Sequence, residues 1–364
     1  MIKIIFVINS LASGGAERVM SVLANEFVDI GYDVSIISKA HYPPFYKLKE
    51  KIRVIFPQNK INYKNKISTL WGRLNVYRNI YNILKQEKPD LVIPFSTTTN
   101  GTVILICKIL RLKVIACEHS NYKVNINSFP TWFIKRWIYP KANFLTVLTK
   151  RDKDQFYGHF MKNVKVMPNP LPIKPIDNQN NSQREKTILA IGSLSRWKIK
   201  GFDNLLKIYS QIVPKYPEWK LKIAGGGNPD FIHSLVKKYN ISKEIELLGE
   251  VKNIQEIMQK SSIFVLPSRW EGLPMVLIEA MSQGMACIAY DCFTGPADII
   301  TNNVDGILIE DQNEKEFIQK ISLLIENESL RKELGRNAVK TSENFLPDKI
   351  VAQWQKLIHE TIHE

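Results

Sequence analysis

The sequence contains few cysteines and lacks any long hydrophobic run. Four cysteines occur among the 364 residues, and none of them has a CxxC or other metal-ligand spacing. This usage is typical of reduced thiols in a cytosol and argues against both a disulfide framework and a zinc site. No apolar stretch approaches the roughly 18 residues that cross a bilayer, and the apolar N-terminus reaches Asn9 too early for a signal peptide. We therefore expect a cytoplasmic protein without a transmembrane segment.

Acidic residues are scarce in the first half of the chain. Residues 1–170 contain 26 Lys and Arg against 10 Asp and Glu, whereas residues 171–364 contain 24 against 25. A general lysine bias of the genome would have made both halves basic. The asymmetry instead predicts an anionic partner for the first half, such as a membrane surface, where each Lys or Arg contributes about 1 kcal/mol. No nucleic-acid partner is expected, because basic residues and aromatics are not interleaved in the spacing of a nucleic-acid-binding motif.

Short β-branched segments alternate with helical patterns along the whole chain, as in parallel βαβ units. The clearest helical pattern covers residues 16–29, where apolar residues recur on one face. Two sets of strands predict an α/β fold with two Rossmann-like, doubly wound parallel sheets, whose ligands bind in a cleft at the carboxyl ends of the strands. The expected strands are 3–8, 33–38, 53–56, 91–96, 113–117, 144–147 and 164–167, followed by 187–191, 221–224, 245–248, 263–267, 287–290 and 306–309.

A segment rich in proline and asparagine separates the two sets of strands. Four prolines occur in residues 167–175, and no apolar period follows them before residue 184. We expect an N-terminal domain over 1–168, a linker over 169–186 and a C-terminal domain over 187–346. The last helix, about 347–364, has an apolar stripe and is expected to pack back on the N-terminal domain.

A turn of small residues follows the first strand. Gly14 and Gly15 precede the helix at 16–29, so free backbone N–H groups and the helix dipole favour an anion there. The GxGxxG fingerprint is absent and no acidic residue ends the second strand near Ser38, which argues against a dinucleotide. A phosphate-bearing ligand of another kind is therefore predicted, although a tight βα turn alone would explain one of the glycines.

Two glutamates eight residues apart follow a buried strand in the second half. Glu279 falls inside an apolar helix, where an uncompensated carboxylate would cost several kcal/mol. The hydroxyl groups of a sugar or a ribose would compensate it, whereas the alternative is a solvated pair with Glu271 on a surface helix. Three cations, Arg196, Lys198 and Lys200, crowd an earlier loop and suit a diphosphate.

Five motifs occur in order along the chain and together form a recognisable pattern. They are Gly14–Arg18, Glu118–Asn121, Lys200–Asp203, Ala224–Gly227 and Glu271–Glu279. Together they resemble retaining glycosyltransferase family 4, which has the GT-B fold, and the resemblance covers nearly the whole chain. It implies transfer of a sugar from a nucleoside diphosphate sugar, expected to be a UDP-sugar, to a glycan acceptor.

The resemblance also implies roles for individual residues. The expected catalytic residues are His119, over the donor sugar at the reaction centre, and Glu271, which contacts the sugar hydroxyls. Glu279 would hold the ribose. The groups expected at the donor diphosphate are Gly14, Gly15, Arg196, Lys200, Met275 and Val276, and those expected to frame the nucleobase are Gly249, Glu250 and Val251.

One position departs from the family pattern. The family commonly has Gly-Arg-Leu where this chain has Gly192-Ser193-Leu194, so the usual diphosphate arginine is missing. We assign its role to Arg196, with Lys198 as the rival.

We expect no metal or other cofactor, because cations and helix N-termini would stabilise the leaving diphosphate. Asp152 and Asp154 form the only DxD pair in the sequence, and we interpret them as a solvated helix start. Two alternative functions stay open. A UDP-sugar epimerase of the same fold would need no acceptor, and an inactive membrane-associated binding protein is disfavoured by the intact Glu271, Glu279 and Lys200.

Aromatic and basic residues are mixed in the first half. Residues 132–139 read Trp-Phe-Ile-Lys-Arg-Trp-Ile-Tyr, and a second basic stretch precedes them. We predict that this domain lies on the inner face of the cell membrane and receives a lipid-diphosphate-linked acceptor in assembly of a capsule, O-antigen or other surface polysaccharide. A core helix or a solvated face is the alternative. The basic stretch comprises Lys47, Lys49, Lys51, Arg53, Lys60, Lys64, Lys66, Arg73 and Arg78.

Overall fold

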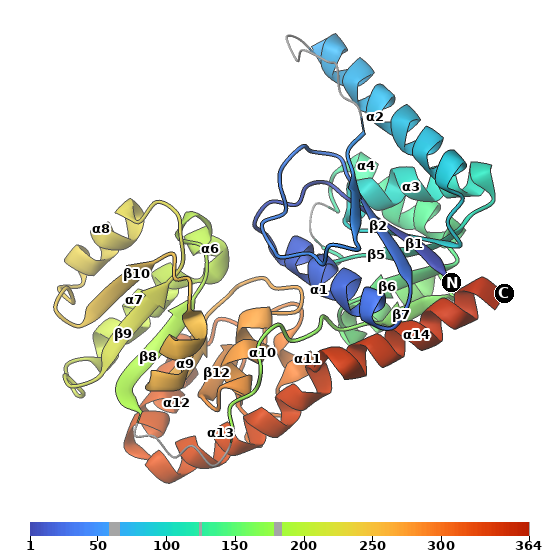
Figure 1. The fold of residues 1–364 in the computed structure, drawn as a ribbon. Helices are drawn as coiled ribbons and strands as arrows, with labels where there is room; N and C mark the ends of the chain where they lie inside the picture. Colours follow the sequence, from blue (N-terminus) through green and yellow to red (C-terminus); the bar gives the residue numbers. More distant parts are fainter. Residues whose placement is uncertain (58–65, 124–125, 178–183, 364) are drawn as a thin grey trace. The chain divides into compact units, whose positions relative to one another are not determined.

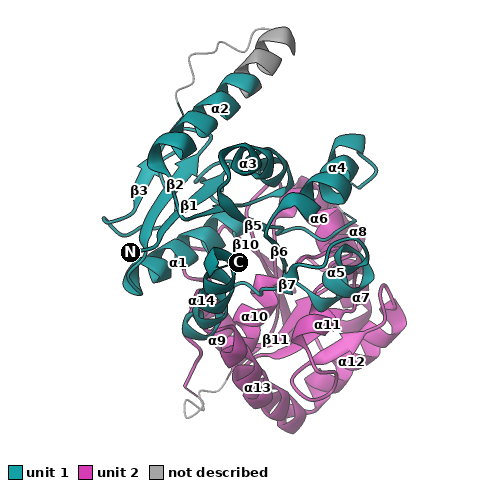
Figure 2. Ribbon diagram, turned by 90° about the vertical axis from the view of Figure 1, so that its right-hand side faces the viewer, with its two compact units in different colours: residues 1–170, 347–364 teal, residues 171–346 magenta. Residues whose placement is uncertain are grey.

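The computed structural model describes residues 1–57, 66–123, 126–177 and 184–363 (Figure 1). The chain divides into two compact units, of which unit 1 contains residues 1–170 and 347–364 and unit 2 contains residues 171–346 (Figure 2). Each unit has a parallel β-sheet flanked by helices. The predicted fold class, two Rossmann-like parallel sheets, is thereby confirmed.

Seven parallel strands form the sheet in the described part of unit 1. They are β1 (Lys3–Ile8), β2 (Asp33–Ser38), β3 (Arg53–Ile55), β4 (Leu91–Pro94), β5 (Lys113–Cys117), β6 (Phe144–Val147) and β7 (Val164–Val166). Their order is β3-β2-β1-β4-β5-β6-β7, and Phe6 of β1 pairs with Ile36 on one side and Ile93 on the other. Because successive side chains of a strand point to opposite faces, Phe6 and Ile5 belong to different core clusters.

Helices cover both faces of this sheet. One core cluster joins the sheet to α1 and α14, where Trp354 of α14 packs edge-on against Phe27 of α1. The other cluster joins it to α2, α3 and the η1–η2 segment. The helices of unit 1 are α1 (Gly15–Asp29), α2 (Lys66–Glu87), α3 (Thr97–Leu110), α4 (Phe129–Phe133), the π-helix η1 (Ile134–Ile138), the 3₁₀ helices η2 (Tyr139–Lys141) and η3 (Tyr157–His159), α5 (Lys150–Gln155) and α14 (Pro347–His363).

Six parallel strands form the sheet in the described part of unit 2. They are β8 (Glu185–Ile191), β9 (Lys220–Ala224), β10 (Ile245–Gly249), β11 (Ser261–Leu266), β12 (Ala286–Tyr290) and β13 (Ile307–Ile309). Their order is β10-β9-β8-β11-β12-β13. The helices are η4 (Leu194–Arg196), α6 (Trp197–Lys200), α7 (Phe202–Ile212), α8 (Asp230–Lys238), α9 (Ile254–Lys260), α10 (Met275–Ser282), α11 (Pro296–Ile299), α12 (Glu314–Glu326), α13 (Glu328–Ser342) and η5 (Glu343–Phe345).

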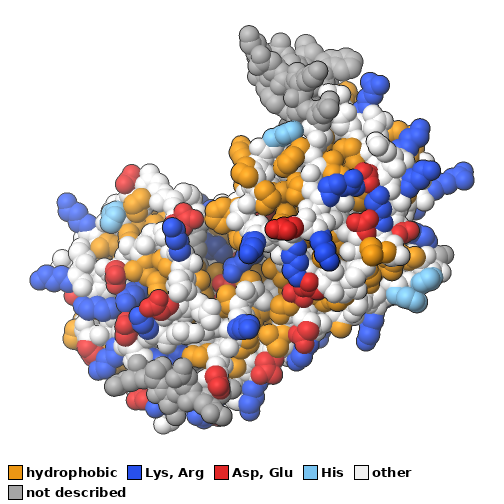
Figure 3. All heavy atoms as spheres, viewed as in Figure 1, with side chains coloured by type: hydrophobic (Ala, Val, Ile, Leu, Met, Phe, Trp, Pro, Cys, Tyr) orange, Lys and Arg blue, Asp and Glu red, His pale blue; other side chains and the backbone are white. Residues whose placement is uncertain are grey.

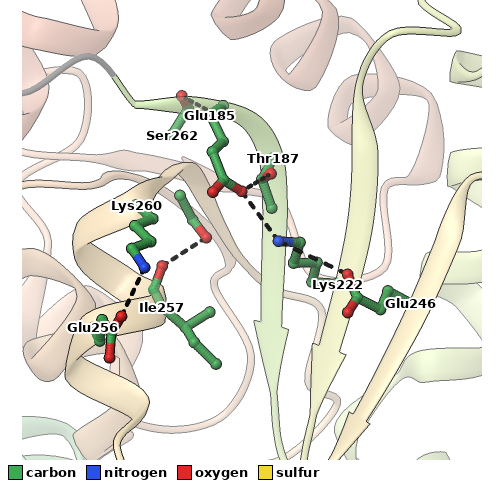
Figure 4. Close-up of polar contacts among 9 residues, drawn as sticks. Glu185, Thr187, Lys222, Glu246, Glu256, Ile257, Lys260 and Ser262 are labelled. Atoms are coloured by element: carbon green, nitrogen blue, oxygen red, sulfur yellow. Dashed lines mark hydrogen bonds and ion pairs between the residues drawn. The ribbon is translucent and has the colours of Figure 1, made fainter.

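All thirteen predicted strands are present, and their ends differ from the prediction by at most two residues. The strand predicted from residue 187 begins at Glu185, because its charged start pairs with β11. There the Ser262 hydroxyl donates to the Glu185 carbonyl, and Lys222 lies between the carboxylates of Glu185 and Glu246 (Figure 4). These exposed ion pairs lie at the amino ends of the strands, opposite the predicted site, and contribute little stability.

Part of the predicted linker is attached to unit 2. The Ile176 amide donates to the Ser282 carbonyl at 2.9 Å, and the Gln283 side chain donates to the Lys174 carbonyl at 2.9 Å. The Arg184 guanidinium, just before β8, bonds three backbone carbonyls of unit 2. Residues 171–177 are therefore part of unit 2 and not a free connection, and 178–183 lie outside the described residues.

The charge difference between the halves follows the two units. Unit 2, which is near neutral, carries acidic and basic side chains interspersed over the face shown in Figure 3. The excess of Lys and Arg belongs to unit 1.

Candidate functional site

The predicted site residues lie at the carboxyl ends of the strands in both units. In unit 1, Gly14 and Gly15 follow β1, and His119 follows β5. In unit 2, the remaining predicted groups lie at the end of β10 and in the loops and helices that follow β8, β10 and β11. Each group is positioned by its own sheet, as expected for ligand sites of parallel α/β sheets.

The turn between β1 and α1 is shaped by Gly14. Gly14 is the N-cap of α1, and its carbonyl accepts from the Arg18 amide at 3.0 Å. A Cβ atom on Gly14 would collide with the Glu17 carboxylate, which folds back over this residue. Glu17 is not among the predicted site residues, although an acid three positions after an N-cap is a known capping pattern. The Glu17 carboxylate therefore lies at the N-terminus of α1, where we also expect a phosphate group.

His119 is a neutral imidazole stacked on an aromatic ring. Its ring lies 4.6 Å from the Phe95 ring at an angle of 12°. Both ring nitrogens are covered, and neither has a hydrogen-bond partner among the described residues. Burial lowers the pKa of His119 to about 4, and the nearby Glu118 carboxylate opposes this shift only in part. Near neutral pH the imidazole can thus offer one donor and one acceptor to a ligand.

The stability of the protein should therefore depend on pH through His119. An unfolded histidine titrates near 6.5, but folded His119 titrates near 4, so between these values the unfolded state binds the additional proton. The stabilisation is complete above about pH 6.5 and is lost as the pH falls toward 4. We expect the wild type to lose about 3 kcal/mol more than His119→Gln between pH 7 and pH 4 in chemical denaturation. Equal losses in the two proteins would contradict a buried neutral imidazole.

Two buried carboxylates flank the His119 loop, and neither is solvated. Glu118 is not among the predicted site residues, although it is an acid directly after a buried strand in a half with few acids. Asp152, predicted to be solvated, is buried and accepts from the Tyr122 amide at 2.8 Å. The helix start itself is as predicted, because the Thr149 hydroxyl caps α5 by accepting from the Asp152 amide. The Thr149 hydroxyl also donates to Oδ2 of Asp152 at 2.9 Å, so this carboxylate is bonded within the protein at the start of α5.

The aromatic segment 129–141 is exposed on one side only. Phe129, Trp132, Phe133 and Trp137 are 71%, 40%, 43% and 53% exposed, and we call them the aromatic patch. Lys135, which the membrane interpretation of this segment would place at the surface, is 0% exposed, and Ile138 and Tyr139 are also buried. No helix in the described part of the chain is both long and apolar enough to cross a membrane.

The basic stretch is only partly available for an anionic surface. Lys49 pairs with Asp29, and Arg53 pairs with Glu87. Lys47, Lys51 and Arg78 are exposed. Lys60 and Lys64, with the side chains of Lys66 and Arg73, lie outside the described residues.

In unit 2 the structure brings Lys200 and Glu271 together. The Lys200 ammonium lies 2.8 Å from Oε1 of Glu271, which also accepts from the Ser268 hydroxyl at 2.6 Å. Both side chains are largely buried, with 16% and 10% of their surface exposed. A Cβ on Gly192 would press on the Lys200 side chain at 3.0 Å, so this glycine leaves room for it.

A second ion pair holds the Lys200 turn in place. The Arg269 guanidinium donates to both carboxylate oxygens of Asp203, at 2.7 and 3.0 Å, and to the Lys198 carbonyl. Gly201, with φ +68°, follows Lys200 and approaches the Pro267 carbonyl too closely to allow a Cβ. Arg269 is not among the predicted site residues. Both Arg196 and Lys198 are exposed, so burial does not separate the two rival assignments.

The helix α10 presents the remaining donor-binding candidates. It begins at Met275, so the amides of Met275 and Val276 are among the N–H groups that a helix leaves without an internal partner. Glu279, one turn later, is buried. The alternative of a solvated glutamate pair is therefore wrong.

The loops after β8, β9 and β10 are joined by backbone hydrogen bonds. The Gly225 amide donates to the Gly249 carbonyl at 2.7 Å, and the Leu194 amide donates to the Gly226 carbonyl at 2.8 Å. Gly249 has φ +63°, and Gly226 lies beside the Glu250 side chain. The predicted nucleobase-framing residues thus lie next to the glycines of the Ala224–Gly227 motif.

Two family models match the chain, one in each half. The model described as Glycosyl transferases group 1 matches residues 173–341, and the model described as Glycosyltransferase Family 4 matches residues 13–174.

Curated relatives and solved structures match over nearly the full length. The amylovoran biosynthesis glycosyltransferase AmsD of Erwinia amylovora is 30% identical over 99% of this chain and 100% of its own. A Campylobacter jejuni α-1,4-N-acetylgalactosaminyltransferase, whose name gives a diphospho-undecaprenol-linked acceptor, is 32% identical over 99% of both chains. A Staphylococcus aureus TarM mutant in complex with UDP has a TM-score of 0.79 and 17% identity, covering 98% of this chain and 100% of its own. The chain therefore belongs to the glycosyltransferases of group 1 and family 4 and has the GT-B fold.

Proposed function

We propose that the protein is a retaining glycosyltransferase that moves a sugar from a UDP-sugar to a lipid-diphosphate-linked glycan in surface polysaccharide assembly. The observation that carries the proposal is the buried Lys200–Glu271 pair beside the N-terminus of α10. The Lys200 ammonium, the Glu271 carboxylate that it holds and the amides at the start of α10 thus belong to neighbouring segments of unit 2. The name of the Campylobacter relative supports a lipid-linked acceptor, and the TarM complex supports UDP.

The groups of unit 2 suit the charge that develops during glycosyl transfer. Breaking the bond between sugar and diphosphate leaves negative charge on the leaving phosphates and positive charge on the sugar ring. Lys200, Arg196 and the amides of Met275 and Val276 would stabilise the phosphates. Glu271, with Oε1 held by Lys200 and Ser268, would bind the sugar hydroxyls. Glu279 would hold the ribose.

In unit 1, the proposed groups are His119 and the β1–α1 turn. The covered nitrogens of His119 suit the hydroxyls of the transferred sugar, because a buried imidazole gains the hydrogen bonds that it lacks in the protein. Gly14 and Gly15 would meet phosphate at the N-terminus of α1.

The direct test is release of nucleotide from a panel of sugar donors. The protein is incubated with UDP-, GDP- and ADP-sugars, with and without lipid-diphosphate-linked glycans, and the products are analysed. We expect UDP release and a lengthened glycan only when the acceptor is present. An epimerised UDP-sugar formed without acceptor, or no turnover with any donor, would contradict the proposal.

We further propose that transfer needs no metal ion, because protein cations and amides serve the leaving diphosphate. Activity in excess EDTA is expected to equal that in buffer, within about twofold, since no charge at the site would be removed. The measurement is nucleotide release with and without chelator. Loss of activity that Mg²⁺ or Mn²⁺ restores would contradict this.

The aromatic patch supports association with the inner face of the membrane. Four exposed rings on one short segment would insert among lipid headgroups, and the basic residues of unit 1 would add attraction to anionic lipid. We expect binding to anionic vesicles to fall with salt and to fall about tenfold in Trp132→Ser/Phe133→Ser. Vesicle co-sedimentation measures this, with Leu323→Ser, an equally exposed residue of unit 2, as the control. Unchanged binding of the double variant would refute the role of the patch.

A further inference from the structure

The carboxylate of Glu118 is buried at the base of the His119 loop and surrounded by donors. It accepts from the hydroxyls of Thr97 and Tyr139, each at 2.7 Å, and from the hydroxyl and amide of Ser120, at 2.6 and 3.2 Å. These donors come from α3, η2 and the loop itself. Hydrogen bonds to a charged group are roughly twice as strong as neutral ones, so Glu118 is fixed from several directions.

The other end of the same loop is held by Lys135. Its ammonium donates to the Tyr122 carbonyl at 2.9 Å and lies 5.2 Å from the centre of the Tyr122 ring. Asp152 completes this end by accepting from the Tyr122 amide. Burial lowers the pKa of Lys135, which the carboxylates of Glu118 and Asp152 oppose. The segment between Glu118 and Tyr122 is therefore anchored at both ends by buried charged groups.

His119 lies between these two anchors and makes no side-chain hydrogen bond to the described residues. Stacking on Phe95 restricts the plane of the ring, but stacking does not fix where the ring nitrogens lie within that plane. The position of the ring nitrogens within that plane therefore depends on the backbone of the loop. A displacement of about 1 Å of a reacting group can cost about a hundredfold in rate.

We propose that Glu118, Tyr139 and Lys135 are positioning residues that hold the His119 imidazole in the place where it acts on the sugar. This inference rests on the proposed role of His119. Tyr139 and Lys135 belong to the segment that carries the aromatic patch, but their side chains are buried and bond to Glu118 and to the Tyr122 carbonyl of the loop.

The test compares two buried tyrosines that each lose only a hydroxyl group. In Tyr139→Phe, Glu118 loses one donor. In the control, Tyr209→Phe, the lost hydroxyl donates to the Trp219 and Glu244 carbonyls in unit 2. We expect similar losses of thermal stability, but a fall in kcat of about tenfold or more in Tyr139→Phe alone, with the KM for the donor unchanged.

A spectroscopic measurement makes the positioning visible. The ring protons of His119 are shifted by the ring current of Phe95, and NMR resolves them once His119→Gln identifies their signals. We expect these signals to move in Tyr139→Phe and in Glu118→Gln, and to stay in place in Tyr209→Phe. Should Tyr139→Phe fail to fold, Thr97→Val removes another donor to Glu118 and takes its place.

The outcomes separate the inference from the function on which it rests. If His119→Ala loses activity while Tyr139→Phe and Glu118→Gln keep kcat within twofold and leave the His119 signals in place, the positioning role is overturned. If His119→Ala keeps full activity, the proposed role of His119 fails, and the inference fails with it. Absence of any sugar transfer by the wild type would instead overturn the proposed function.

Discussion

Glu279→Ala is expected to weaken the binding of UDP by about a hundredfold. The carboxylate is buried in α10, and the proposed ribose would supply hydroxyl donors to it. Each hydrogen bond to a charged group contributes about 1.5 to 3 kcal/mol, and two such bonds correspond to at least this loss. Titration calorimetry with UDP measures the effect.

The control for Glu279 is Glu246→Ala. Glu246 is an exposed acid of the same unit that lies at the opposite ends of the strands (Figure 4). UDP affinity should stay within twofold in this variant. Glu279→Gln keeps the volume of the side chain and separates loss of charge from loss of packing. Wild-type affinity in Glu279→Ala would refute the ribose role.

Glu271→Gln is expected to lower kcat by about two to three orders of magnitude while UDP affinity changes little. Glu271 lies in the loop after β11, and its contacts with Lys200 and Ser268 fix its carboxylate. Removing one group aimed at developing charge costs about 2.7 to 4 kcal/mol in other enzymes. Without its partner, Lys200 would also lose its fixed position.

Steady-state kinetics and calorimetry together test this expectation. The informative comparison is Ser268→Ala, which removes one hydrogen bond to Glu271 and keeps the ion pair. Its kcat should fall far less, by about tenfold or less. A Glu271→Gln variant that binds UDP poorly but turns over normally would reverse the roles assigned to Glu271 and Glu279.

Most of the fold could be predicted from the sequence because buried parallel strands have a clear local pattern. The segment of β1 is a short apolar run bounded by turn residues, and this pattern favours a buried strand over other secondary structure. The place of Glu279 inside an apolar helix was also predictable. A glutamate inside an apolar helix, such as Glu279, needs a polar partner wherever the helix lies.

The environment of His119 could not be predicted in this way. Lys135 stands among aromatics in the sequence and has the pattern of a surface cation. Lys135 is buried while Trp137, two residues later and on the opposite side of the helical turn, is exposed; which of these two sides faces the sheet is decided by the tertiary structure. Likewise, the donors to Glu118 come from residues 97 and 139, which only the tertiary structure brings together.

The return of α14 to unit 1 determines the order in which the two units can fold while the chain is being synthesised. Unit 2 is one continuous segment, residues 171–346, whereas the core of unit 1 includes Trp354 and its neighbours from the last helix. During translation, the first half therefore leaves the ribosome with the surface that covers Phe27 still missing. The second half is expected to fold first, although it is made later, and the N-terminal half completes its core only after residues 347–364 have left the ribosome.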